Sequence, residues 1–109
     1  MVGAVKTGTI SAAGETDIGP AGGSRVSSWL IQFEDASFSG SVTVKGAAQD
    51  TAYTALAIGY KDMATSAVAT AAITGNALIL VDSSGCSIQL DCTSYTSGDL
   101  NYTCIPLVG

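Results

Sequence analysis

The fold of this chain is constrained most strongly by two segments that match each other. They are 32–44 (QFEDASFSGSVTV) and 89–102 (QLDCTSYTSGDLNY). Equivalent residues lie 57 positions apart (89 − 32), and one extra residue before Gly98 makes the offset 58 from there on. The matched pairs are Gln32 and Gln89, Glu34 and Asp91, Ser37 and Ser94, Phe38 and Tyr95, Gly40 and Gly98, Val42 and Leu100, and Val44 and Tyr102. Each segment has the pattern of a strand, a Ser-Gly turn and a returning strand. The match predicts two equivalent hairpins in a two-layer β fold.

The clearest single strand covers residues 24–34, where large apolar residues alternate with mostly polar ones at a period of two. Such alternation places one face of a strand on a core and leaves the other face wetter. The residues expected to face the core here and in the next strand are Trp29, Ile31, Phe33, Val42 and Val44. Leu30 falls on the wetter face and indicates that this surface is covered in part.

The rest of the chain also favours β structure, because β-branched residues and glycines recur and no 3.6-residue period is present. Further strands are expected at 7–13, 41–45, 53–60, 66–73, 77–81, 86–95 and 99–105, with turns at 61–63, 74–76 and 82–85. The apolar run 77–81 is typical of a strand buried on both faces.

About eight short strands separated by turns predict an all-β fold, specifically a jelly-roll-like antiparallel β-sandwich. We expect residues 24–109 to form the sandwich core. Residues 1–23 are expected to be an N-terminal arm with a candidate first strand and a Gly-rich loop over 14–23, in which 1–6 have no core contacts of their own.

The charge balance limits the choice of partner. The 109 residues carry a net charge of −5, and the four cations form no basic stripe that would neutralise phosphates, so we expect no nucleic-acid partner. Only 12% of residues are charged, which suggests that much of the surface contacts other protein. No apolar stretch approaches 20 residues and no signal peptide is visible, so we expect no membrane partner.

The three cysteines, Cys86, Cys92 and Cys104, are an odd number and argue against a complete disulfide framework. Cys92 and Cys104 share the parity of apolar neighbours, which favours buried thiols. A cross-strand disulfide between these two residues is the alternative if a hairpin turn centres on Gly98. A zinc site is not expected, because the chain has no His and no Cys-x-x-Cys pair.

Catalytic groups are scarce in the sequence, and we expect a protein that is not an enzyme. Without His, the usual general base near neutral pH is missing. Glu34 and Asp35 are adjacent and point to opposite faces of a strand, so they are poor partners for acid–base chemistry. The turn 82–85 offers oxygens but lacks the spaced ligands of a calcium loop. We therefore expect no catalytic, metal or cofactor-binding residues.

Exposed apolar side chains are the remaining candidates for a functional surface. The residues selected as a candidate protein interface are Met1, Val2, Val5, Leu30, Phe38, Tyr53 and Tyr95. Phe38 and Tyr95 stand at matching positions before the two Ser-Gly pairs. They are interpreted either as caps on the two ends of the core, which the shared residue type favours, or as exposed anchors for a partner.

Three segments carry a resemblance to a known family: 38–46 (FSGSVTVKG), 81–85 (VDSSG) and 93–98 (TSYTSG). Over about residues 24–107 the chain resembles small tailed-bacteriophage virion proteins, although the Asp-Gly-Thr-x-Trp turn of that family is replaced by 48–53 (AQDTAY). These motifs are structural rather than catalytic.

The resemblance implies a β-sandwich that decorates a capsid or forms part of a fibre or tail. We expect a decoration (cement) protein that is made in the host cytoplasm and sits on the outer capsid surface of the virion. Its expected partners are the major capsid protein and itself, as a homotrimer. The alternative is a receptor- or glycan-binding module of a head fibre or tail.

Overall fold

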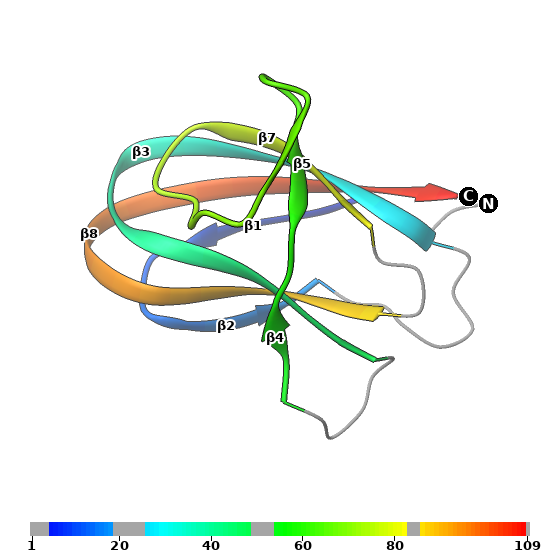
Figure 1. The fold of residues 1–109 in the computed structure, drawn as a ribbon. Coiled ribbons are helices and arrows are strands. Elements are labelled where there is room, and N and C mark those ends of the chain that lie inside the picture. Colours follow the sequence, from blue (N-terminus) through cyan, green and yellow to red (C-terminus); the bar gives the residue numbers. More distant parts are fainter. Residues whose placement is uncertain (1–4, 19–25, 49–53, 83–85, 109) are drawn as a thin grey trace.

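The computed structural model describes residues 5–18, 26–48, 54–82 and 86–108, and the described residues contain strands but no helix (Figure 1). The strands are β1 (Lys6–Ile10), β2 (Gly14–Asp17), β3 (Val26–Ala48), β4 (Leu56–Ala57), β5 (Tyr60–Asp62), β6 (Ala67–Ala69), β7 (Ala77–Asp82) and β8 (Cys86–Val108). All eight belong to one antiparallel sheet. The expected all-β class and number of strands are confirmed, but β3 and β8 are 23 residues long rather than short.

The two matching segments pair with each other instead of forming two hairpins. β3 and β8 run antiparallel from the pair Val26 and Val108 to the pair Ala48 and Cys86, and each repeat lies within a single strand. The hairpin prediction was therefore wrong. A two-residue hairpin of type I′ needs consecutive residues with positive φ, whereas each long strand has a single one near the Ser-Gly pair: Ser37 (φ 61°) and Gly98 (φ 79°). A single left-handed residue with a register shift produces a bulge and a bend.

The two bends carry the β3–β8 ribbon from an upper layer into a lower one (Figure 1). The upper layer has the strand order β1–β8–β3–β7–β5–β6 and uses residues 26–35 of β3 and 100–108 of β8. The lower layer has β2 and β4 on either side of residues 42–48 of β3 and 86–92 of β8. The jelly-roll-like sandwich expected from the sequence stays a prediction, because the eight strands form one continuous sheet.

One hydrophobic core fills the space between the layers. Its fully buried side chains come from both halves of the ribbon and from the segments beside it, and the largest are Trp29, Phe33, Ile18, Ile31, Ile79, Ile88, Leu90, Leu100, Val42, Val81 and Cys104. All five residues expected to face the core are buried, and the most exposed of them, Val44, is 2% exposed. The alternation in β3 predicted these positions because each half of the strand has only one face on the core.

The described residues of the expected N-terminal arm, 5–18, include two strands of this sheet. β1 and β2 pair with opposite halves of β8, and Ile10 and Ile18 are buried in the common core. The loop expected over 14–23 is wrong for Gly14–Asp17, which form β2. Local composition favoured a loop there, but the backbone of β8, more than 70 residues away in the sequence, supplies hydrogen-bond partners.

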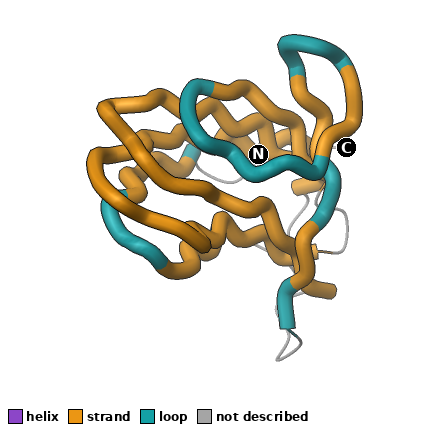
Figure 2. The backbone as a smooth tube through the Cα atoms, turned by 60° about the vertical axis from the view of Figure 1, so that its left-hand side comes forward, coloured by secondary structure: helices purple, strands orange, loops and turns teal. Residues whose placement is uncertain are grey.

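The segment from β4 to β5 crosses from one layer to the other. Leu56 and Ala57 pair with the lower half of β3, whereas Lys61 and Asp62 pair with β7 in the upper layer. A single strand over 53–60 followed by a turn at 61–63 is therefore not what forms. The hairpin of β5 and β6 stands out from the rest of the molecule, and its turn is the highest point in both views (Figures 1 and 2).

Candidate protein interaction surface

The outer surface of the upper layer presents apolar side chains to solvent. We call these side chains the apolar face, and they are Val5, Leu30, Val68, Leu78, Leu80, Ile105 and Leu107. Val68 is 80% exposed, Val5 55% and Ile105 39%, and the four leucines are half-buried. Isolated exposed apolar residues are common on proteins, whereas residues that share one face of a sheet form a patch.

The pairing register places four of these residues in one row with Lys61, namely Ile105, Leu30, Leu80 and Val68. Leu30 lies opposite both Ile105 and Leu80, and Lys61 lies opposite both Leu80 and Val68. Directly opposed residues point to the same side of a sheet, so the row runs across β8, β3, β7, β5 and β6. With Val5 beside it at the β1 edge and further leucines in the adjacent rows, the face covers about 24 Å by about 14 Å at the usual strand spacings.

The sequence repeat provides an internal comparison for this face. Leu30 and Ile105 are cross-strand partners in the upper layer. Continuing the offsets of 57 and 58 beyond the two matched segments relates them to Ser87 and Ala47, which are cross-strand partners in the lower layer. Leu78 pairs with Gln32, and Asp17 pairs with the equivalent Gln89. The same positions of the fold are therefore apolar in one layer and small or polar in the other. The fold therefore accommodates small or polar residues at positions equivalent to those of the apolar face.

The outer surface of the lower layer is polar and carries an ion pair. Lys45 Nζ lies 2.5 Å from Asp91 Oδ2, and Glu15 lies opposite Asp91 in the neighbouring strand. The hydrogen bond to Asp91 raises the pKa of Lys45, although partial desolvation acts in the opposite direction. The side chains of Lys45 and Asp91 are partly buried, so the charged groups of this layer are held by each other.

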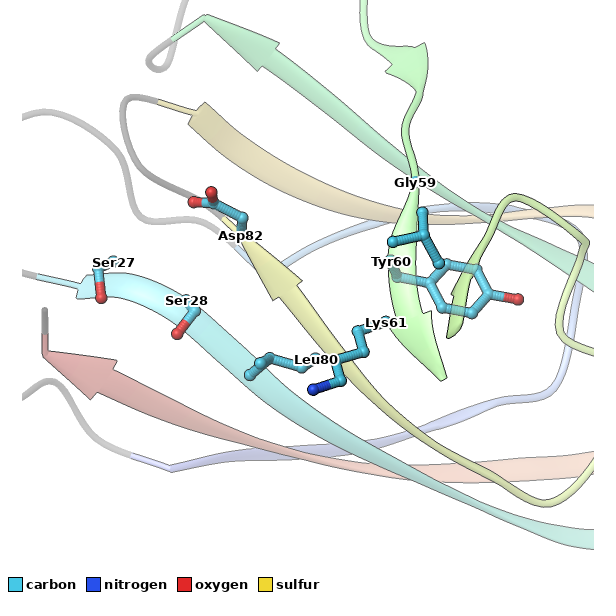
Figure 3. A pocket seen from close by; sticks show the side chains of 8 residues that line it. Ser27, Ser28, Gly59, Tyr60, Lys61, Leu80 and Asp82 are labelled. Carbon is cyan, nitrogen blue, oxygen red and sulfur yellow. The ribbon is translucent and has the colours of Figure 1, made fainter. Parts of the chain in front are cut away.

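A groove of about 510 Å³ interrupts the apolar face where β5 leaves β7 (Figure 3). Lys61 and Asp62 pair with β7, whereas the residues that precede them come from β4 in the lower layer, and this divergence opens the groove. Its lining residues are Ser27, Ser28, Gly59, Tyr60, Lys61, Val68, Leu80 and Asp82. Leu80 and Val68 supply its apolar part, and the Lys61 side chain extends beside Leu80 (Figure 3).

The interface residues expected from the sequence are distributed between surface and core. Leu30 and Val5 lie on the apolar face, whereas Phe38 is 7% exposed and belongs to the core cluster. The Phe38 and Tyr95 rings are 6.2 Å apart, and the Tyr95 hydroxyl donates a hydrogen bond to the Gly98 carbonyl. This burial favours the interpretation of Phe38 as a cap on the core rather than an exposed anchor. Met1, Val2 and Tyr53 lie outside the described residues.

Sequence reasoning missed Leu80, Leu78 and Ile105 as surface residues. The run 77–81 is typical of a strand buried on both faces, but in the structure Ile79 and Val81 are buried, whereas Leu78 and Leu80, which alternate with them, are half-buried. The alternation in β3 contained a usable signal, because Leu30 already indicated an apolar outer face for that sheet.

The described cysteine side chains do not form a disulfide. Cys92 and Cys104 are buried free thiols, and they lie in different layers beside Val42 and Ile31, because Gly98 is a bend and not a hairpin turn. Burial raises the pKa of Cys92, and raises that of Cys104 to about 12, so both thiols are protonated at neutral pH. In the described ranges, no three His, Cys, Asp or Glu side chains gather as metal ligands.

Comparison with family models, curated proteins and solved structures found no match to this chain. Within the residues that the structure describes, no helix is long and apolar enough to cross a membrane.

Proposed function

We propose that this protein is a non-enzymatic capsid decoration (cement) protein of a tailed bacteriophage, located on the outer capsid surface of the virion. In this proposal the apolar face binds the outer surface of the major capsid protein lattice and stabilises the shell. The observation that carries it is the difference between the layers, where Leu30 and Ile105 replace the equivalent Ser87 and Ala47. The phage assignment is supported by the resemblance of 38–46 and 93–98 to virion proteins.

The size of the apolar face indicates how such a protein would bind. Removing about 300 Å² of apolar surface from water contributes about 8 kcal/mol. Association itself costs about 4–15 kcal/mol, so one copy would attach weakly. A homotrimer presents three such faces and binds with a much higher overall affinity if they engage together. The proposed partners are therefore the major capsid protein and two further copies of this chain.

The charges agree with an outer location. The net charge of −5 and the polar surface of the lower layer suit a side that faces solvent rather than packaged DNA. A protein that binds only the expanded shell stabilises that state by mass action. The free energy of stabilisation grows with the logarithm of the protein concentration once this exceeds the Kd.

A second candidate function is a receptor- or glycan-binding module of a head fibre or tail. The groove favours this reading, because hydroxyl groups from Ser27 and Ser28 lie near its apolar part. The copy number distinguishes the two functions, since a cement protein occurs in hundreds of copies per virion and a fibre or tail module in a few dozen or fewer.

The experiment that tests the proposal compares shells with and without the protein. Shells assembled without it should rupture at a lower temperature, and adding the purified protein back should restore their resistance. Mass analysis of intact virions should find hundreds of copies. Equal robustness of both shells, or a few dozen copies, would contradict the cement function.

A further inference from the structure

We infer that the groove beside Leu80 binds an extended polypeptide segment of the partner, with an aliphatic side chain next to an acidic one. The aliphatic side chain would lie over Leu80 and Val68, which flank Lys61 in the row. The carboxylate would pair with Lys61, whose side chain lies beside Leu80 (Figure 3). This inference rests on the proposed function, because it names the part of the partner that the apolar face would recognise.

The apolar part of the groove is accessible and incompletely packed. Val68 is 80% exposed even though it lies opposite Lys61 in the β5–β6 pair, and Leu80 on the other side of Lys61 is half-buried. Residue 59, also at the groove, is a glycine, and a Cβ there would lie 3.3 Å from Val68 Cγ1. The absence of that Cβ leaves Val68 open to an incoming side chain. An aliphatic group placed over Leu80 and Val68 would remove both from water.

Lys61 and Asp82 are the two charged residues that line the groove, and Lys61, which lies in the apolar row, favours an acidic residue as the second half of the ligand. Lys61 is exposed and makes no ion pair within the described ranges, in contrast to Lys45, which is held by Asp91. Lys61 therefore places a cation inside an otherwise apolar row of an acidic protein. A carboxylate of the partner complements it, whereas an opposing Lys or Arg would be repelled.

The shape of the groove favours a chain in extended conformation. The groove lies along the point where β5 and β7 diverge, so it is open along the sheet rather than enclosed. Ser28 lies in the row next to Leu30 and Leu80, and its hydroxyl makes no hydrogen bond to the described residues, which leaves it available to a peptide backbone. Extended segments that lie on a sheet use alternate side chains for specificity.

The test is an NMR titration of the isotope-labelled full chain with two short peptides. One is acetyl-Thr-Leu-Glu-Val-Thr-amide, and the other has Lys in place of Glu. The Glu peptide should shift the amide resonances of Lys61, Val68 and Leu80, and at low salt it should bind about two- to fivefold more tightly than the Lys peptide, the range of a solvent-exposed ion pair. Lys61→Glu should reverse this preference. Lys6→Glu makes the same change in net charge on β1, away from the groove, and should leave the preference intact.

Three results would overturn the inference. The first is a set of amide resonance shifts that map away from the groove, and the second is equal affinity of the wild-type protein for both peptides. The third is a set of shifts at Lys61, Val68 and Leu80 that depend on protein concentration alone, which would mean that a second copy of the chain occupies the groove. Binding of an oligosaccharide but neither peptide would favour the glycan reading instead. Because no shell is used, a failed titration leaves the shell-stability test of the cement function independent of this result.

Discussion

Gly98 lies against the carbonyl oxygen of Ser37 so closely that a Cβ at residue 98 would sit 1.9 Å from that oxygen. The two residues belong to the facing bends of β8 and β3, and both have positive φ values. The fold of the ribbon into two layers therefore depends on the missing side chain at residue 98.

Gly98→Ala should destabilise the protein by at least about 2–3 kcal/mol, because it adds a steric clash to an unfavourable backbone conformation. Gly75→Ala is the matched control, since the nearest atom to a Cβ there is 3.7 Å away and the residue does not have positive φ. Its effect should stay within about 0.5 kcal/mol. Urea unfolding of both variants measures the difference, and equal midpoints would show that the bend tolerates a side chain.

The stability should fall at alkaline pH because of the buried thiol of Cys104. Its pKa is raised in the folded protein to about 12 from an ordinary value of 9.0, so the unfolded chain releases this proton first. The contribution is fully present below about pH 9 and is lost as the pH rises toward 12, at up to about 1.4 kcal/mol per pH unit. Unfolding midpoints measured from about pH 8 to about pH 11 should fall less steeply with pH in Cys104→Ala than in the wild-type protein. An identical slope in both proteins would assign the effect to other groups.

The ion pair of the lower layer should be visible in the titration of Lys45. Asp91→Asn should lower the raised pKa of Lys45, because the hydrogen bond that Lys45 donates to Asp91 is its largest cause. Glu15→Gln should lower it less, since Glu15 acts only through a weaker charge interaction. The stabilisation from a raised Lys pKa is present at neutral pH and disappears as the pH rises above about 10.4. NMR titration of the Lys45 side chain measures both changes, and a larger effect from Glu15→Gln would contradict the geometry.

The core positions of β3 were predictable from sequence, whereas the path of the strands was not. The burial of Trp29, Ile31 and Phe33 follows from local alternation, which needs no knowledge of neighbours. The pairing of 32–44 with 89–102 depends on contacts distant in sequence, and a strand–Ser-Gly–strand pattern does not distinguish a turn from a bend. The crossing between β4 and β5, which opens the groove, is likewise fixed by the two layers together.

The candidate site was predictable only in part for the same reason. Leu30 stood out because a large apolar residue interrupted the wetter face of a well-defined strand. Leu80 lies in a run where every residue is apolar, so its outward orientation appears only when Leu30 and Lys61 are placed opposite it. Phe38 was a candidate by type and position, but the bend turns it into the core.

The most direct test of the central claim exchanges residues between the two equivalent faces and measures co-sedimentation with expanded shells. The double variant Leu30→Ser, Ile105→Ala gives the upper layer the residues found at the equivalent lower positions, and Ser87→Leu, Ala47→Ile is its counterpart in the lower layer. Circular dichroism confirms that each variant keeps its strands. The upper-layer variant should lose at least about tenfold in shell affinity, because central apolar contacts are removed. The lower-layer variant should bind like the wild type. Unchanged binding of the upper-layer variant, or loss of binding in the lower-layer variant alone, would contradict the central claim.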